Sequence, residues 1–345
     1  MSKRVLLTGY AGYVGQVLLP MLKAEGHTVV GIDTDLYRDA DCAPFEQPDE
    51  SIFCDMRDIR SDMLQGCDAV IHLAALSNDP IGNLDRSLTI DINYEASLRL
   101  ARLAKGAGVD RFLFSSSCSM YGAAGDALLD ESAEFNPITP YGESKVLADR
   151  AISELATDDF SPAFLRNATA YGFSPRLRLD LVVNDFAAAA YLDKRIFIKS
   201  DGTPWRPLVH VADIARAFVA IMGAQKKLIH NEAFNVGSTD ENYRVSEVAD
   251  IVQRLVEGCQ VEYDPAGGPD KRCYRVRCDK LVHRLPSFQC EWTVEKGVSE
   301  LLRAYEQYGL TRDAVTGKRY FRLAGLERRR QEGVIDDQLR PIATG

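Results

Sequence analysis

The sequence predicts an α/β fold in which a doubly wound parallel sheet is accompanied by a smaller, discontinuous α/β domain. Short apolar, β-branched segments alternate with segments of helix length along the first half of the chain. The short segments are apolar at nearly every position, which is typical of parallel strands that helices bury on both faces. The expected strands are residues 5–7, 29–32, 69–73, 112–114 and 163–165.

The regular alternation weakens after Tyr171, where turns rich in Gly and Pro separate shorter elements. A helix over residues 214–221 and a strand over residues 233–236 then predict a return to the sheet. We therefore expect two interwoven domains and a helical extension that is solvated or packs against another subunit. The first domain takes residues 1–174 and 207–237, the second takes 175–206 and 238–310, and the extension takes 311–345.

Composition and charge narrow the classes of protein. The chain has 345 residues, 46% of them hydrophobic, and a formal net charge of −9. A general nucleic-acid binder is not expected, because contact with phosphates needs a basic surface. No apolar run is long enough to span a membrane, and the first residues lead directly into a strand, so we expect a cytoplasmic protein without membrane contact.

The eight cysteines form no C-x-x-C pair and have no histidine at metal-ligand spacing. We therefore expect reduced, mostly buried thiols and no metal site. Cys118 alone lies inside a motif, which is described below.

A glycine-rich loop follows the first expected strand directly and opens a helix. Glycines at such a junction allow a tight turn and bring the backbone close to a pyrophosphate at the positive helix terminus. Three glycines alone would suit any strand-to-helix turn, but their place at the first strand–helix junction favours a dinucleotide site of the Rossmann type. The loop consists of Gly9, Tyr10, Ala11, Gly12, Tyr13, Val14 and Gly15.

Asp33 ends the second expected strand. A carboxylate at this place accepts hydrogen bonds from the adenosine ribose and repels a 2′-phosphate, which favours NAD over NADP. In isolation Asp33 would also suit a solvated turn, but beside the glycine loop it indicates a ribose ligand. Arg38 is the nearest basic residue that could offset the repulsion.

Tyr141 and Lys145 are spaced i, i+4, so both side chains project from one face of an expected helix. Thr139 is the expected N-cap and Pro140 the first helical residue. A free tyrosine is only about 0.1% ionised at neutral pH, so acid/base chemistry needs a neighbouring cation that stabilises the phenolate. Lys145 and an oxidised nicotinamide would supply that charge. The same pair would also suit an amphipathic helix with a packed Tyr and an exposed Lys.

Two segments, FSSSCSMYG (114–122) and PYGESK (140–145), resemble the active-site motifs of the NAD-dependent epimerase/dehydratase family, whose members include UDP-glucose 4-epimerases. The resemblance implies that Ser117 hydrogen-bonds the reacting sugar oxygen and that Tyr141 is the acid/base. It further implies that Lys145 binds the cofactor ribose and modifies the pKa of Tyr141. A homodimer is expected from this resemblance only.

The resemblance also implies cofactor contacts outside these two motifs. One pair of residues would meet the adenine ring, a strand end would pass the cofactor phosphates, and a helix asparagine would support the active-site strand. These residues are, in that order, Asp55 and Met56, then Leu73, Ala74 and Ala75, then Asn93.

On the substrate side, the resemblance implies a nucleotide-diphosphate sugar. Arg206, in the segment DGTPWRPLVHVAD (201–213), resembles the arginine that grips the substrate diphosphate, and Asn184 resembles an amide donor to it. Arg272 resembles a second arginine ligand, since two guanidiniums can clamp adjacent phosphates, although a solvated surface position would suit it equally. The other implied substrate contacts are Ser77, Ser117, Cys118, Ser119 and Thr169, the last in place of an asparagine of many relatives.

The residues after Ser117 bear on the type of reaction. Related sugar 4,6-dehydratases carry an Asp-Glu pair there, and related uronate decarboxylases commonly carry a glutamate at the second position; this chain has Cys118 and Ser119. We therefore expect epimerisation at one carbinol centre, C4, without loss of water or carbon dioxide. The alternatives are a ketoreductase or dehydrogenase, a dehydratase and, outside the enzymes, an NAD-sensing scaffold. The scaffold is disfavoured because Ser117, Tyr141 and Lys145 are all present.

Overall fold

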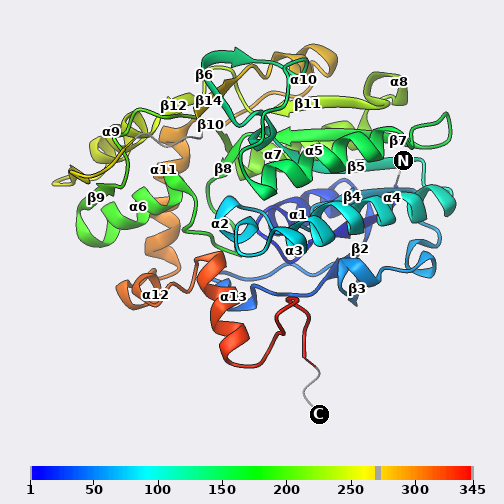
Figure 1. Ribbon diagram of the computed structural model, residues 1–345, viewed down its shortest axis with the longest axis horizontal. Coiled ribbons are helices and arrows are strands. Elements are labelled where there is room, and N and C mark those ends of the chain that lie inside the picture. Colours follow the sequence, from blue (N-terminus) through cyan, green and yellow to red (C-terminus); the bar gives the residue numbers. More distant parts are fainter. Residues whose placement is uncertain (1, 269–272, 343–345) are drawn as a thin grey trace.

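The computed structural model describes residues 2–268 and 273–342. At its centre lies a seven-stranded sheet in the order β11-β7-β5-β4-β1-β2-β3, in which all neighbouring strands are parallel (Figure 1). This confirms the predicted α/β class. The strands are β1 (Arg4–Thr8), β2 (Thr28–Asp33), β3 (Glu50–Phe53), β4 (Ala69–His72), β5 (Arg111–Ser117), β7 (Ser161–Asn167) and β11 (Glu232–Val236).

Helices cover both faces of this sheet, because successive residues of each buried strand point to opposite sides. One face packs against α1 (Gly15–Ala24) and α7 (Val211–Gly223). The other face packs against α4 (Ala96–Gly106) and α5 (Pro140–Ser153). The sequence did not predict β3, because this edge strand is largely exposed and lacks a continuous apolar run.

The strand order reverses at β1. From β1 the chain goes to β2 and β3 on one side, and then to β4, β5 and β7 on the other. At such a reversal the loops after neighbouring strands diverge and leave a crevice at the carboxyl ends of the strands. The predicted strand 233–236 lies within β11 and pairs with β7, which confirms the expected return to the sheet.

A second hydrophobic cluster lies beside the core of the sheet, and it draws on chain segments that are separated by α7 and β11. Helix α10 (Asp279–Arg284), inside the expected second domain, packs instead against the core of the sheet. The domain boundaries given above stay a prediction. The elements of the second unit are β8 (Thr169–Tyr171), α6 (Val182–Asp193), β9 (Arg195–Ile198), β10 (Trp205–His210), β12 (Asn242–Arg244), α9 (Val245–Leu255), β13 (Gln260–Tyr263) and α11 (Val294–Gln307).

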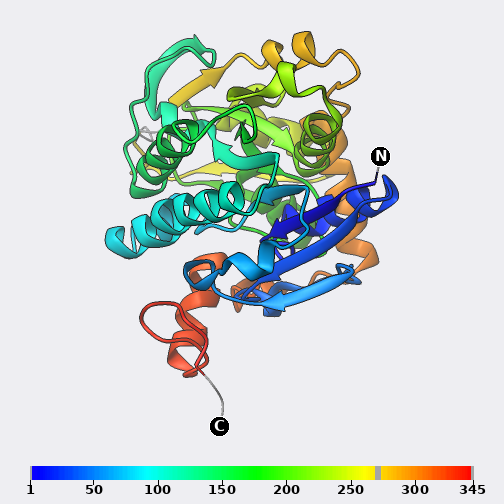
Figure 2. The same cartoon turned by 90° about the vertical axis from the view of Figure 1, so that its right-hand side faces the viewer.

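The C-terminal extension forms α12 (Arg312–Thr316), α13 (Arg322–Gln331) and an irregular tail (Figures 1 and 2, orange to red). It packs against its own chain, so the expectation of a solvated helix is wrong for one of its faces. Leu326, Ile335 and Leu339 form an apolar cluster with residues of the loop after β4 and of α2 and α3. The sequence did not predict this contact, because the apolar residues of the extension are few and widely spaced.

Short elements complete the part of the chain that the structure describes. They are α2 (Asp79–Gly82), α3 (Arg86–Ile90), β6 (Ala123–Leu129), α8 (Lys226–Ile229) and β14 (Cys273–Val276). All eight cysteines are free thiols, as expected; four are buried and four are partly buried. Within residues 2–268 and 273–342, no helix combines the length and the apolar character needed to cross a bilayer.

Candidate active site

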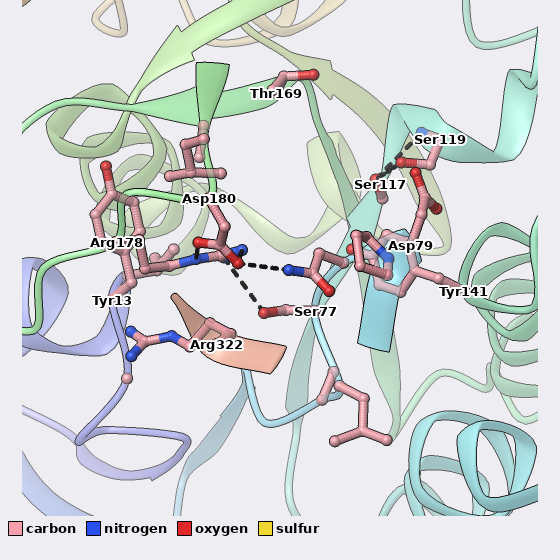
Figure 3. A pocket seen from close by; sticks show the side chains of 18 of the residues that line it. Tyr13, Ser77, Asp79, Ser117, Ser119, Tyr141, Thr169, Arg178, Asp180 and Arg322 are labelled. Carbon is pink, nitrogen blue, oxygen red and sulfur yellow. Dashed lines mark hydrogen bonds and ion pairs between the residues drawn. The ribbon is translucent and has the colours of Figure 1, made fainter. Parts of the chain in front are cut away.

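A cavity of about 860 Å³ opens where the loops after β1, β2, β4, β5 and β7 diverge. Pockets for small ligands usually measure about 300–1,000 Å³. Figure 3 shows side chains from the glycine loop, the strand ends, the second unit and the C-terminal extension around this cavity. It therefore brings together residues from all parts of the fold.

The glycine loop forms one wall of the cavity, and its shape requires glycine. Gly9 has φ of +75°, and a Cβ atom there would lie 2.8 Å from the Ala74 nitrogen. A Cβ atom at Gly15 would lie 2.3 Å from the Gly9 oxygen. Helix α1 begins at Gly15 without a side-chain cap, and the positive end of its dipole lies at the glycine loop. These features fit the pyrophosphate of a dinucleotide.

Six of the seven loop residues line the cavity, and Tyr10 does not. The ring of Tyr10 packs against Gly31, where a Cβ atom would lie 2.6 Å from the ring, and its carbonyl accepts a hydrogen bond from Gln16. Tyr10 therefore supports the loop from behind. The lining residues are Gly9, Ala11, Gly12, Tyr13, Val14 and Gly15.

Asp33 lies at the cavity, at the end of β2 as predicted. Its Oδ2 accepts a hydrogen bond from the Ala11 N–H at 3.0 Å, and its Oδ1 accepts one from the Asp35 N–H at 2.8 Å. Burial raises the pKa of this carboxyl group, and the two N–H donors oppose the shift. Arg38, the basic residue nearest in sequence, instead pairs with Asp35 at 3.1 Å. These contacts hold the carboxylate in a defined position at the wall.

The other expected cofactor contacts lie at the cavity, with one exception. Asn93 is fully buried in a π-helical turn between α3 and α4, and it does not line the cavity. Its side chain holds both backbone groups of Leu76 and donates to the Ser144 hydroxyl at 3.2 Å. Asn93 thus joins the loop after β4 to α5, which is a supporting position. Those that line the cavity are Asp55, Met56, Leu73, Ala74 and Ala75.

Helix α5 carries two of the expected catalytic residues, and it begins as predicted. Thr139 caps the helix by accepting a hydrogen bond from the Gly142 N–H, and Pro140 is the first helical residue. The Lys145 ammonium lies 5.9 Å from the centre of the Tyr141 ring, and it donates to the Ser115 carbonyl at 2.7 Å. Both side chains line the cavity.

Ser117, at the end of β5, faces the same space. Its hydroxyl lies 2.9 Å from the hydroxyl of Ser119, and it accepts a hydrogen bond from the Ser119 N–H. Figure 3 shows Ser117, Ser119 and Tyr141 close together at one end of the pocket. The structure thus brings the three expected catalytic side chains to one wall of the cavity.

Burial shifts the pKa values of Tyr141 and Lys145 in opposite directions. It raises the pKa of Tyr141 to about 12, and a hydrogen bond with Ser117 opposes this shift. It lowers the pKa of Lys145 to about 8, and Asp149 opposes that shift. Removal from water disfavours the charged form of each group. A positive charge bound in the cavity would stabilise the Tyr141 phenolate.

The lowered pKa of Lys145 predicts a pH dependence of stability in the NAD-free protein. Between about pH 8 and 10.5, the unfolded chain keeps a proton that the folded chain has released. The free energy of unfolding should therefore rise with pH in this window by about 1 kcal/mol per pH unit. Urea unfolding of the wild type relative to Lys145→Met measures this rise, with the exposed Lys227→Met as control. A flat difference between pH 8 and 10 would contradict the burial of a charged Lys145.

Ser77, Ser119, Thr169 and Arg206, for which a substrate contact was expected, all line the cavity. Ser77 lies beside Arg178, whose guanidinium donates to its hydroxyl at 3.3 Å. Asn167 lines it as well and donates to the Ser115 hydroxyl at 3.1 Å. An asparagine is therefore present beside Thr169, at a position that the sequence reasoning missed. Arg272, the expected second arginine, lies outside the described residues.

Cys118 and Asn184 do not line the cavity, although a substrate contact was expected for both. Cys118 is fully buried behind Ser117, and its thiol lies 3.1 Å from the Arg166 carbonyl. Burial raises the pKa of the Cys118 thiol far above its ordinary value, so it is not an acid/base at neutral pH.

The Asn184 amide turns toward the interior, where it holds Gly172, Arg178 and Tyr13. Asn184 is fully buried. Asn184 therefore fixes the loop that enters α6.

Several lining residues were not expected from the sequence. Asp79 accepts a hydrogen bond from the Thr139 hydroxyl at 2.7 Å and lies beside Tyr141 in Figure 3. It lies two residues after Ser77, the residue of this loop for which a substrate contact was expected. Further unexpected lining residues include Tyr274 of β14. Irregular or C-terminal segments that no motif distinguishes contribute Tyr37, Arg176, Arg178, Asp180, Phe321, Arg322 and Leu339.

Known proteins resemble this chain over most of its length. The UDP-glucuronate 4-epimerase of Thermodesulfobacterium geofontis is 27% identical over 268 residues, which cover 73% of this chain and 80% of that protein. The UDP-glucose 4-epimerase of Neisseria meningitidis serogroup C is 26% identical over 343 residues, which cover 87% of this chain and 95% of that protein. The UDP-glucuronic acid decarboxylase 2 of Arabidopsis thaliana is 26% identical over 274 residues, which cover 76% of this chain and 59% of that protein.

A solved structure and a family model also match this chain. The structure of MoeE5 in complex with UDP-glucuronic acid and NAD matches with a TM-score of 0.77 and 27% identity, covering 88% of this chain and 99% of that one. Residues 5–237, more than half of the chain, match the NAD dependent epimerase/dehydratase family. They include the glycine loop, Asp33 and the Ser117, Tyr141 and Lys145 group. The chain therefore belongs to the NAD-dependent epimerase/dehydratase family, and NAD is its cofactor.

Proposed function

We propose that this enzyme epimerises a nucleotide-diphosphate sugar by transient oxidation of one carbinol, at C4. A single observation carries the proposal: Ser117, Tyr141 and Lys145 line the same cavity as the glycine loop and Asp33. Bound NAD supplies an electrophilic carbon that takes up a hydride and gives it back. A UDP-sugar is the proposed substrate, because relatives at 26–27% identity are named UDP-sugar 4-epimerases. A cytoplasmic location and a homodimer stay predictions.

The protein's own groups would move the proton. Tyr141 takes the proton of the sugar hydroxyl as the carbonyl forms, and it returns that proton when the carbonyl is reduced from the other face. Ser117 holds the reacting oxygen by a hydrogen bond. Lys145 lies close enough to Tyr141 to stabilise the phenolate by its charge, and its own position is held by the Ser115 carbonyl.

A dehydratase is a second candidate, and Asp79 is the observation that favours it. Elimination of water needs a second acid/base group beside the sugar. Neither Cys118, which is buried behind the cavity, nor the Ser119 hydroxyl suits that role. Asp79 places a carboxylate near Tyr141, at the end of the cavity where the sugar would react. Epimerisation remains the proposal because the relatives with the name of an epimerase cover most of the chain.

The product of the reaction separates these candidates. Purified enzyme is incubated in D₂O with a panel of UDP-sugars, and the products are followed by NMR and mass spectrometry. The expected product has an unchanged mass, an inverted C4 centre and no deuterium on carbon, because the hydride returns without exchange with water. Tyr141→Phe protein in a parallel incubation controls for contaminating activity. A product lighter by one water supports the dehydratase, and a change of two hydrogens supports a ketoreductase; either result refutes epimerisation.

A further inference from the structure

The C-terminal extension forms part of the wall of the cofactor cavity. Phe321, Arg322 and Leu339 line the same cavity as the glycine loop and Asp33. The family match ends at residue 237, so these contacts come from a segment outside it.

The extension is tied to the segment that carries the expected adenine contacts. Arg57 forms an ion pair with Asp55 at 2.7 Å and donates to the Gln338 carbonyl at 2.9 Å. Arg340 pairs with Asp58, in the same short segment. The apolar cluster around Leu326 holds the other side of the extension. These contacts fix the extension beside the adenosine end of the cavity.

Arg322 is the feature of this wall that needs a partner. It is 3% exposed, it stacks over the Tyr37 ring at 4.3 Å, and its guanidinium donates to the Arg176 carbonyl at 3.3 Å. In the described ranges, no carboxylate forms an ion pair with it. Burial, followed by the nearby charge of Arg178, lowers the pKa of Arg322 to about 9. The Tyr37 hydroxyl beside it is also buried, without a hydrogen-bond partner in the described chain.

The neighbouring arginines differ from Arg322 in this respect. Arg176 pairs with Asp35 and Asp41, both at 2.7 Å, and Arg178 pairs with Asp180 at 3.0 Å. A buried charge without a counter-ion is costly, and an anionic ligand would remove that cost. Asp180, a nearby carboxylate whose charge favours the charged form of Arg322, already pairs with Arg178. Within the described residues, the cavity wall therefore offers a ligand a guanidinium that has no ion pair of its own.

The places of Arg322 and its neighbour Arg178 indicate which ligand these guanidiniums would bind. The Arg178 guanidinium lies 5.8 Å from the ring of Tyr13, a residue of the glycine loop, and donates to the Ser77 hydroxyl at 3.3 Å. Figure 3 shows Arg322 on the side of Tyr13 and Arg178, away from Tyr141. Arg206, the expected ligand of the substrate diphosphate, instead lies near Tyr274, a neighbour of Ser119.

We propose that Arg322, together with Arg178, binds the diphosphate of NAD opposite the glycine loop, and that the C-terminal extension thereby slows the release of NAD. Guanidiniums suit this task because their fork of N–H donors matches phosphate oxygens. The inference depends on NAD binding in this cavity and is independent of the proposed epimerisation, so each can fail without the other.

The test compares Arg322→Gln with Arg330→Gln, a matched change on the same helix. Arg330 is more exposed, lies away from the cavity and pairs with Asp337. Calorimetry on NAD-free protein should show NAD affinity about 10–100-fold weaker for Arg322→Gln, the loss expected for a charge-assisted hydrogen bond. Release of NAD from loaded protein should be faster to a similar degree. Arg330→Gln should match the wild type in both measurements.

A second measurement distinguishes the two possible diphosphates. UDP binding to NAD-loaded protein should be equal in the wild type and both variants. If Arg322→Gln weakened UDP binding and left NAD binding unchanged, the arginine would serve the sugar nucleotide and the proposal would be overturned.

Further readouts separate ligand binding from a structural role. Adenosine, which has no phosphate, should bind Arg322→Gln and wild type alike; an equal loss for adenosine and NAD would overturn the proposal. The melting temperature of NAD-free Arg322→Gln should be unchanged or higher, and its rise on addition of NAD should be smaller than in the wild type. A lower melting temperature with an unchanged NAD affinity would show that Arg322 only supports the fold.

Discussion

Replacement of Tyr141 by phenylalanine should lower kcat by about 100-fold or more, while the fold and the affinity for NAD are kept. The change removes one hydroxyl from the cavity wall and keeps the Cβ and backbone contacts of residue 141 with Gly82 at the start of α5. Because Ser117 is also a neutral hydroxyl and Lys145 is held at the Ser115 carbonyl, neither can easily take over the proton transfer. Initial rates with the UDP-sugar identified by the NMR panel measure the effect.

The control for this variant is Tyr308→Phe, which removes a hydroxyl from a tyrosine that is 38% exposed and away from the cavity. Its kcat should equal that of the wild type. Circular dichroism and calorimetric titration with NAD should give the same result for both variants. Wild-type turnover by Tyr141→Phe would exclude Tyr141 as the acid/base.

NADP should bind at least about 100-fold more weakly than NAD, a difference of about 3 kcal/mol. The Asp33 carboxylate is held by the N–H groups of Ala11 and Asp35, so it cannot turn away from a 2′-phosphate. Two cations near Asp33 are engaged by other carboxylates, because Arg38 pairs with Asp35 and Arg176 pairs with Asp35 and Asp41. Calorimetric dissociation constants for the two dinucleotides test this preference.

Asp33→Asn should reduce the ratio of the two dissociation constants about 10-fold, because the amide keeps an acceptor and loses the charge. Asp62→Asn is a suitable control, since Asp62 is exposed and pairs with Arg60 on the surface. Equal affinities of the wild type for NAD and NADP would show that Asp33 does not face the ribose.

The sequence predicted the parts of the site that depend on residues close together in the chain. The glycine loop, the end of β2 at Asp33 and the start of α5 at Pro140 all lie where the patterns indicated. Their conformations follow from local rules: glycine where a Cβ atom would collide, and a threonine cap before a proline. Parallel strands of continuous apolar residues then bring the loops after them to one edge of the sheet.

The direction in which a side chain points was less predictable than the element that carries it. Asn184 lies in α6 near the expected place, yet its amide is used to hold the loop before that helix. Cys118 follows the expected catalytic serine, yet it is buried in an apolar cluster with residues of β14. A motif aligns positions along the chain, whereas orientation depends on which hydrogen bonds the surrounding backbone still lacks.

By itself the sequence determined the fold class, through the period of the apolar residues, and the place of the glycine loop, through local backbone geometry. The family and the expected catalytic residues came from the resemblance of two motifs. Only the tertiary structure decided that Arg178 and Arg322 flank the cofactor cavity and that the C-terminal extension closes one side of it. Such contacts join segments far apart in the chain, here Leu326 and Leu339 against Leu76 and Ile81. They form when a few apolar residues, separated along the chain, pack against a complementary surface. The spacing of residues along the chain does not predict that surface.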